Sequence, residues 1–82
     1  MDQIIYQNGE YAETVKLESG NVRLIECARR KNILLYRLEW REGKHEQNAP
    51  FYSWEEAEAA FMKKAEIAEA IAAIDAQSVW NR

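Results

Sequence analysis

The sequence predicts an α+β fold, with a four-stranded antiparallel β-meander followed by one long C-terminal helix in the order ββββα. Short apolar segments separated by turn residues fill the chain up to Pro50, and a helix-capping sequence with an alanine-rich run fills the rest. The chain has 82 residues, 48% hydrophobic and 30% charged. We therefore expect one small domain, 1–82, with the sheet in 1–52 and the helix in 53–80.

The first three predicted strands are separated by two turn signals. Asn8-Gly9 is a pair that two-residue hairpin turns prefer, and it lies between apolar segments at 4–6 and 11–17. Residues 18–21, Glu-Ser-Gly-Asn, form the second turn signal, after which we expect a strand over 22–28.

The fourth predicted strand, 33–41, follows a basic turn at 29–32. Its side chains alternate between an apolar face and a polar face, as in a half-buried strand. The apolar face comprises Leu34, Tyr36, Leu38 and Trp40, and the polar face comprises Arg37, Glu39 and Arg41. We expect a polar loop over 42–48, and 49–52 as a short extended piece or the approach to the helix.

The helix is predicted to begin at Ser53, because Ser53 and Glu56 have the spacing of a capping box. Nine alanines between Ala57 and Ala76 favour its continuation to about residue 78 or 80. One stripe of mostly small side chains is expected to pack on the sheet. Its members are Trp54, Ala57, Phe61, Ala65, Ala68, Ala72 and Val79.

A second apolar stripe on this helix predicts a dimer or partner contact. Ile67, Ile71 and Ile74 have the alternating spacing of 4 and 3 residues that is typical of two paired helices. A helix that packs on one sheet needs only one apolar side, so this second stripe is available for another contact. The predicted interface consists of Ile67, Ile71, Ile74 and Trp80. In the alternative interpretation, the helix breaks near 75–78 and Trp80 folds back over the sheet edge.

The residues that could support catalysis are few. A single cysteine, Cys27, and a single histidine, His45, exclude a disulfide within the chain and a zinc site of the usual type. We interpret His45 as a solvated loop residue and Cys27 as a small core residue. The sequence therefore predicts no enzyme, cofactor or metal site, and with no apolar span or signal core we expect a cytoplasmic protein without membrane contact.

The net charge of -3 conceals two regions of opposite sign. Residues 22–44 hold seven basic and three acidic groups, whereas 53–82 hold three basic and six acidic groups. The predicted acidic face of the helix comprises Glu55, Glu58, Glu66 and Glu69. The predicted nucleic-acid contact comprises Arg23, Arg29, Arg30, Lys31, Arg37 and Arg41. The alternative, which we favour, is that these charges keep a hairpin tip and a sheet edge soluble.

Two segments resemble the flanks of a WGR domain. Residues 32–38 fit a strand of the type Asn-x-x-x-Tyr-x-Leu, and 55–64 fit a helix of the type Glu-Glu-Ala-x-x-x-Phe-x-x-Lys. The resemblance spans 22–65; the Trp-Gly-Arg tripeptide is absent, and Trp40-Arg41-Glu42-Gly43 stands near its place. In some members this domain contributes to DNA binding, which the resemblance implies as one possible role here.

These patterns lead to two functional hypotheses. The leading one is a small, dimeric, non-enzymatic protein-binding module, comparable in scale to phage-type inhibitors or adaptors that act on a larger nucleic-acid-binding machine. The alternative is a nucleic-acid-binding module that uses the basic second half of the sheet.

Overall fold

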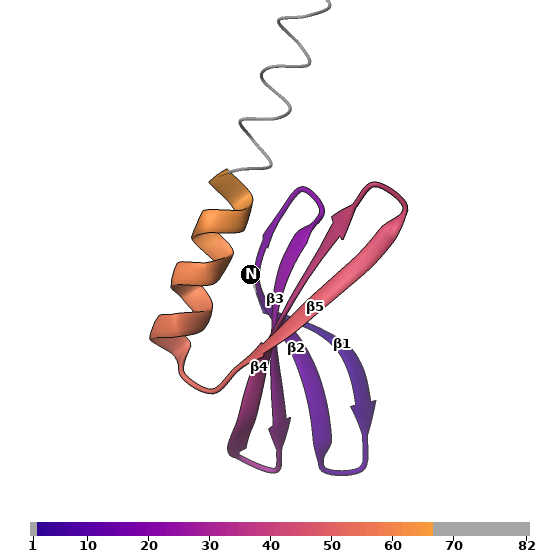
Figure 1. The fold of residues 1–82 in the computed structure, drawn as a ribbon. Coiled ribbons are helices and arrows are strands. Elements are labelled where there is room, and N and C mark those ends of the chain that lie inside the picture. The colour runs from indigo at the N-terminus through magenta and orange to yellow at the C-terminus, as the bar shows by residue number, and fades with distance from the viewer. Residues whose placement is uncertain (1, 67–82) are drawn as a thin grey trace, which may run out of the picture.

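The structure is a computed structural model, and it describes residues 2–66 of the chain. These residues form a five-stranded antiparallel sheet in the order β1-β2-β3-β4-β5, followed by a C-terminal helix whose described part is 54–66 (Figure 1). The α+β class is therefore confirmed, and the expected number of four strands is wrong. The predicted course of the helix to residue 80 lies outside the described residues.

The strands are joined as a simple meander of hairpins. Their bounds are Gln3–Asn8 for β1, Tyr11–Ser19 for β2, Val22–Arg29 for β3, Asn32–Glu42 for β4 and His45–Phe51 for β5. The first four contain the four predicted strands. In the described residues, no helix is long and apolar enough to cross a membrane.

β5 replaces the polar loop that we expected over 42–48. It pairs with β4 without interruption from Glu42↔His45 to Tyr36↔Phe51. β5 is an edge strand with polar, exposed side chains at 45–48, so it lacks the apolar alternation that identifies the other strands. His45 is exposed, as expected, but it opens this strand and does not lie in a loop.

All four hairpins have two-residue turns whose first residue has a positive φ. Three of these residues are glycines, and the fourth is Arg30, with φ 57°. The first turn consists of Gly9 and Glu10, one residue later than the predicted Asn8-Gly9 turn. Two-residue turns in which only the first residue has a positive φ usually have glycine at that position. Arg30 therefore stands where the other three turns have glycine.

The main core lies between the helix and one face of the sheet. From the strands it takes Val22, Leu24, Tyr36 and Leu38, and from the helix Ala57, Phe61 and Ala65. The predicted core stripe of the helix is thus confirmed for its described members, with Trp54 partly buried. Small residues such as Ala57 let the helix lie close to the strands.

The start of the helix is fixed by local contacts. The backbone amide of Glu56 donates to Ser53 Oγ at 3.2 Å, as the capping sequence predicts. The rings of Trp54 and Tyr36 meet edge to face, with centroids 5.4 Å apart.

A smaller cluster lies on the opposite face of the sheet. Val15, Ile25 and Cys27 are buried there, with Tyr11 and Leu35 partly buried against them. The apolar alternation predicted for β4 is confirmed for Tyr36 and Leu38. It is wrong for Leu34, which is 48% exposed because the register of β3 and β4 shifts between Cys27 and Ala28.

Candidate interaction surfaces

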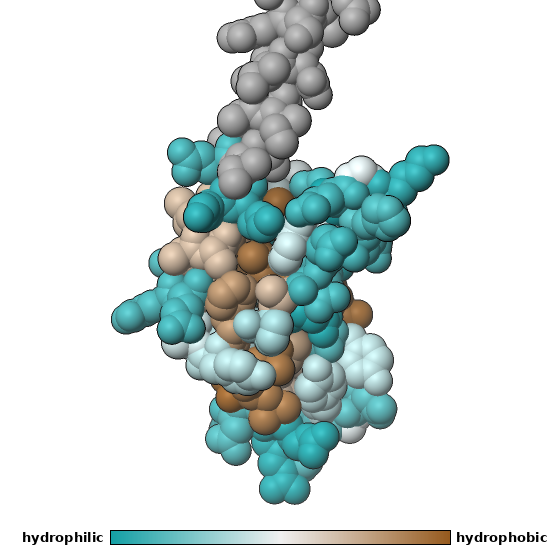
Figure 2. Space-filling view, in the orientation of Figure 1, coloured by the Kyte–Doolittle hydropathy of each residue, from teal (hydrophilic) through white to brown (hydrophobic). Residues whose placement is uncertain are grey.

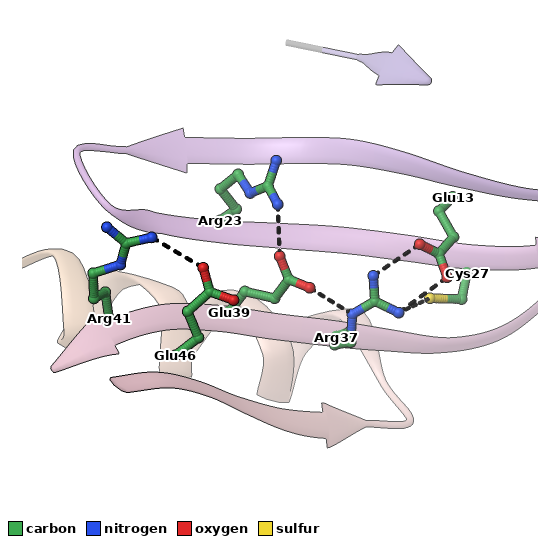
Figure 3. A network of polar contacts seen from close by, with 7 residues as sticks. All are labelled: Glu13, Arg23, Cys27, Arg37, Glu39, Arg41 and Glu46. Carbon is green, nitrogen blue, oxygen red and sulfur yellow. Dashed lines mark hydrogen bonds and ion pairs between the residues drawn. The ribbon is translucent and has the colours of Figure 1, made fainter. Parts of the chain in front are cut away.

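The face of the sheet opposite the helix carries a network of ion pairs (Figure 3). Arg37 binds Glu13 through both terminal nitrogens, at 2.8 and 3.0 Å, and its Nε lies 2.9 Å from Glu39. Arg23 binds the other oxygen of Glu39 at 2.7 Å. Three neighbouring strands are thus joined by charged side chains, over a fully buried Ile25.

The pKa values in this network shift in the directions that its pairs require. The Arg37 guanidinium lowers the pKa of the Glu13 carboxyl, and Glu13 in turn raises the pKa of Arg37. The Tyr11 hydroxyl donates to Glu13 at 2.7 Å, and this bond raises the pKa of Tyr11. Burial raises the pKa of the Cys27 thiol, which disfavours a reactive thiolate. These shifts describe a stable ion-pair network.

The structure divides the basic residues of the predicted nucleic-acid contact into two groups. Four are ion-paired with carboxylates of the same chain: Arg23, Arg30, Arg37 and Arg41, with Glu39, Glu10, Glu13 and Glu46. Arg29 ends β3, Lys31 lies in the β3–β4 turn, and both are exposed and have no ion pair within residues 2–66. Of the six residues in the predicted contact, the two without an ion pair in the described part of the chain therefore lie at this turn.

The predicted acidic face is present on the described part of the helix. Glu55, Glu58 and Glu66 are exposed, and none of them has an ion pair in the part of the chain that the structure describes. Glu69 lies outside the described residues. So does the whole predicted dimer interface, formed by Ile67, Ile71, Ile74 and Trp80.

The helix is held on the sheet by polar contacts as well as by the core. Lys64 Nζ lies 4.3 Å from the centre of the Trp40 ring and 3.7 Å from a carboxylate oxygen of Glu42. The Trp40 indole nitrogen donates to the same carboxylate at 2.9 Å. These contacts fix the position of the helix over β4, so the side of the helix opposite its core residues faces away from the sheet.

The helix covers only part of its face of the sheet. The cross-strand register places seven further residues on this face, in two neighbouring rows: Ile4, Thr14 and Glu26, and Gln7, Ala12, Ala28 and Ile33. We call these residues the open half-face. Ile4 is 59% and Ile33 51% exposed. In Figure 2, hydrophobic residues extend from beside the helix toward the lower end of the sheet.

A polar groove lies between the β2–β3 turn and the β4–β5 hairpin. It has a volume of about 450 Å³, and its charged lining residues include Arg23, Glu39, Arg41 and Glu46. Asn21 Nδ2 donates to the Arg41 carbonyl at 3.1 Å, which fixes the turn against β4. Small-molecule pockets are usually lined by apolar side chains, and the charged groups here already pair with one another.

The comparisons with known proteins add no relative. No family model, curated protein or solved structure matches the chain. The resemblance to the WGR domain therefore stays a prediction. Within residues 2–66, no group of His, Cys, Asp and Glu side chains has a metal-binding arrangement.

Sequence reasoning missed two features of these surfaces. It assigned no role to Glu13, although the alternation of Tyr11, Glu13 and Val15 along one strand already places Glu13 beside Tyr11 on one face. It also missed the open half-face, because no pattern in the sequence indicates where the helix crosses the sheet.

Proposed function

We propose that this chain is a small, non-enzymatic module that binds a protein partner through the open half-face. The observation that carries the proposal is the pair of half-exposed isoleucines, Ile4 and Ile33, which face the same side of the sheet. The register places Gln7, Ala12, Thr14, Glu26 and Ala28 between them. Contiguous apolar surface that a domain leaves uncovered is characteristic of protein interfaces.

The neighbouring apolar residues extend this surface. Ile5 in β1 and Leu34 in β4 follow Ile4 and Ile33 at the two register shifts, and they are 37% and 48% exposed. The strand β1 is also an edge of the sheet and carries no charged residue between Gln3 and Asn8. The opposite edge, β5, contains Glu46 and Pro50, residues that discourage strand pairing. The binding surface that we propose thus lies on the β1 side and the lower end of the sheet.

An adaptor or inhibitor role fits the same surface and the acidic face of the helix. Glu55, Glu58 and Glu66 are exposed and without an ion pair within residues 2–66, so they suit a basic surface on a larger nucleic-acid-binding protein, and such charges steer association. This role is the functional context that we propose for the module.

Site-specific photo-crosslinking in the cells that make the protein tests the proposal. We expect a photoreactive residue in place of Ile33 to yield a discrete protein adduct, and the same residue in place of exposed Asn48 to yield none. Ile4→Glu, across the open half-face, should abolish the adduct while circular dichroism shows an unchanged fold. An absence of adduct at Ile33, or an adduct that is indifferent to Ile4→Glu, would overturn the proposal.

Nucleic-acid binding is the second candidate, and one observation favours it. Arg29 and Lys31 stand exposed at the β3–β4 turn without an ion pair in the described residues. Two cations support only weak, salt-sensitive binding to a phosphate backbone. Gel shifts with single- and double-stranded DNA and with RNA test it, because Arg29→Glu/Lys31→Glu should abolish any retardation seen at low salt. No retardation of any of these nucleic acids at low salt ends this candidate.

A further inference from the structure

The two hairpin turns at the lower end of the sheet are held against each other (Figure 1). The backbone N–H of Arg30, in the β3–β4 turn, donates to the carbonyl of Glu10, in the β1–β2 turn, at 2.7 Å. The side chains of the same two residues form an ion pair. These contacts fix the two hairpin ends relative to each other.

Two aromatic rings and a cation share the face opposite the helix at this end of the sheet. Residues that pair across strands project from the same face. Tyr6 pairs with Glu13 of the ion-pair network, and Tyr11, two residues before Glu13 in β2, pairs with Arg29. Tyr6, Tyr11 and Arg29 therefore all lie on the side of the sheet that carries the network.

Tyr6 presents a ring that is held in place and half exposed. It meets the Tyr11 ring edge to face, with centroids 5.9 Å apart, yet 48% of Tyr6 is exposed. Asn8 Nδ2 donates to the Tyr6 hydroxyl at 3.4 Å. The Tyr11 hydroxyl donates in turn to Glu13 at 2.7 Å, which anchors the inner ring of the pair. An aromatic ring of this kind is suited to stacking with a flat group from outside the protein.

The charge beside these rings is positive in the described part of the chain. Arg29 and Lys31 are exposed and have no ion pair within residues 2–66. Two carboxylates lie in the same region, and both are ion-paired with arginines: Glu10 with Arg30, and Glu13 with Arg37. The strands β1 and β3 are separated by two strand spacings, about 10 Å, so the long Arg29 side chain and the Tyr6 ring can contact one extended ligand.

We infer that this end of the sheet binds single-stranded nucleic acid, with a base stacked on Tyr6 and phosphates beside Arg29 and Lys31. An exposed ring stacks with unpaired bases, whereas the bases of a duplex are already stacked on one another. Cations alone attract phosphates of either form. The inference rests on the second candidate function and names its ligand class. It is independent of the open half-face, which lies on the other side of the sheet.

Fluorescence anisotropy tests the role of the ring, with labelled oligothymidylate, oligouridylate and a DNA duplex at low salt. We expect the wild-type chain to bind the single strands more tightly than the duplex. Tyr6→Ala should weaken single-strand binding by about fivefold or more, through the loss of one stacked base, and leave duplex binding unchanged. Tyr6→Phe keeps the ring and should bind as the wild-type chain does.

The salt dependence of the same binding tests the cations. For single strands, each neutralised phosphate adds about 0.7 to the slope of log K against log salt concentration, so Arg29→Ala/Lys31→Ala should reduce this slope by about 1.4. The matched control, Arg41→Ala/Lys44→Ala, removes the same charge at the β4–β5 hairpin and should leave the slope unchanged. Circular dichroism verifies that each variant is folded.

The inference is overturned by a wild-type chain that binds the duplex as tightly as the single strands, or by a Tyr6→Ala variant that binds single strands as tightly as the wild-type chain. In either case, binding whose salt dependence requires Arg29 and Lys31 would leave the second candidate function standing. A slope that Arg29→Ala/Lys31→Ala leaves unchanged, or no binding at low salt, removes both. The photo-crosslink from Ile33 decides the protein-binding function separately.

Discussion

Replacing Arg30 by glycine should stabilise the protein. Arg30 has φ 57°, the conformation that Gly9, Gly20 and Gly43 adopt at the same position of the other turns. A residue with a Cβ in such a sparsely populated region costs about 1–3 kcal/mol, and Arg30→Gly relieves this cost. The substitution also removes the ion pair with Glu10, whose side chains are 71% and 60% exposed, and such a pair contributes at most about 1 kcal/mol.

The net effect follows from these terms. Glycine adds about 0.5–1 kcal/mol of conformational freedom to the unfolded chain, which opposes the gain. We expect a net stabilisation of about 0.5–1 kcal/mol, equivalent to a rise in Tm of roughly 2–8 °C for a domain of this size. Thermal and urea unfolding followed by circular dichroism measure both quantities.

Arg30→Ala is the matched control, because it loses the same ion pair and keeps the strained φ. Arg30→Gly should be more stable than Arg30→Ala by about 1 kcal/mol or more. The reciprocal change, Gly20→Ala, should destabilise through the backbone alone, since a Cβ at Gly20 meets no atom within 4 Å. If Arg30→Gly proves no more stable than Arg30→Ala, the turn is not strained and the reasoning fails.

Three further predictions follow from the ion-pair network and the helix contacts. The folded-state pKa of Glu13 is lowered, so its carboxylate stabilises the protein at neutral pH and loses this effect as the pH falls through that pKa. Glu13→Gln should therefore lower the free energy of unfolding at pH 7 and flatten its decline in acid. Urea titrations in which this free energy falls equally with pH in wild type and variant would contradict the prediction. Cys27 is 3% exposed with a raised thiol pKa, so a thiol reagent should label it only on unfolding, and rapid labelling of the native protein would refute the burial. Lys64→Met should cost about 0.5–1 kcal/mol through the lost contact with Trp40, and unchanged urea unfolding would show that this contact contributes nothing.

The parts of the fold that the sequence predicts are those with local signals. Turn residues and apolar alternation identify the first four strands, and the capping pair Ser53 and Glu56 identifies the start of the helix. β5 gives no such signal, because an edge strand exposed along most of its length has no need of apolar residues at 45–48.

The candidate surfaces depend on register and packing, which local patterns do not encode. Arg37 reaches Glu13 because the strand register pairs Glu13 with Cys27 and Arg37 with Ile25, two residues away on the same face of β3. The sequence therefore suggested free cations where the structure has ion pairs. It identified Glu55, Glu58 and Glu66 correctly as exposed, since their helical spacing opposite the core stripe is a local property.

Solvent paramagnetic relaxation tests the uncovered state of the open half-face most directly, in a protein whose isoleucine and leucine methyl groups carry ¹³C. We predict strong broadening by a soluble paramagnetic agent at the Ile4 and Ile33 methyls and none at Leu24, which is buried beneath the helix. Ile4 and Ile33 signals that stay sharp would show that this face is covered, and they would contradict the proposed binding surface.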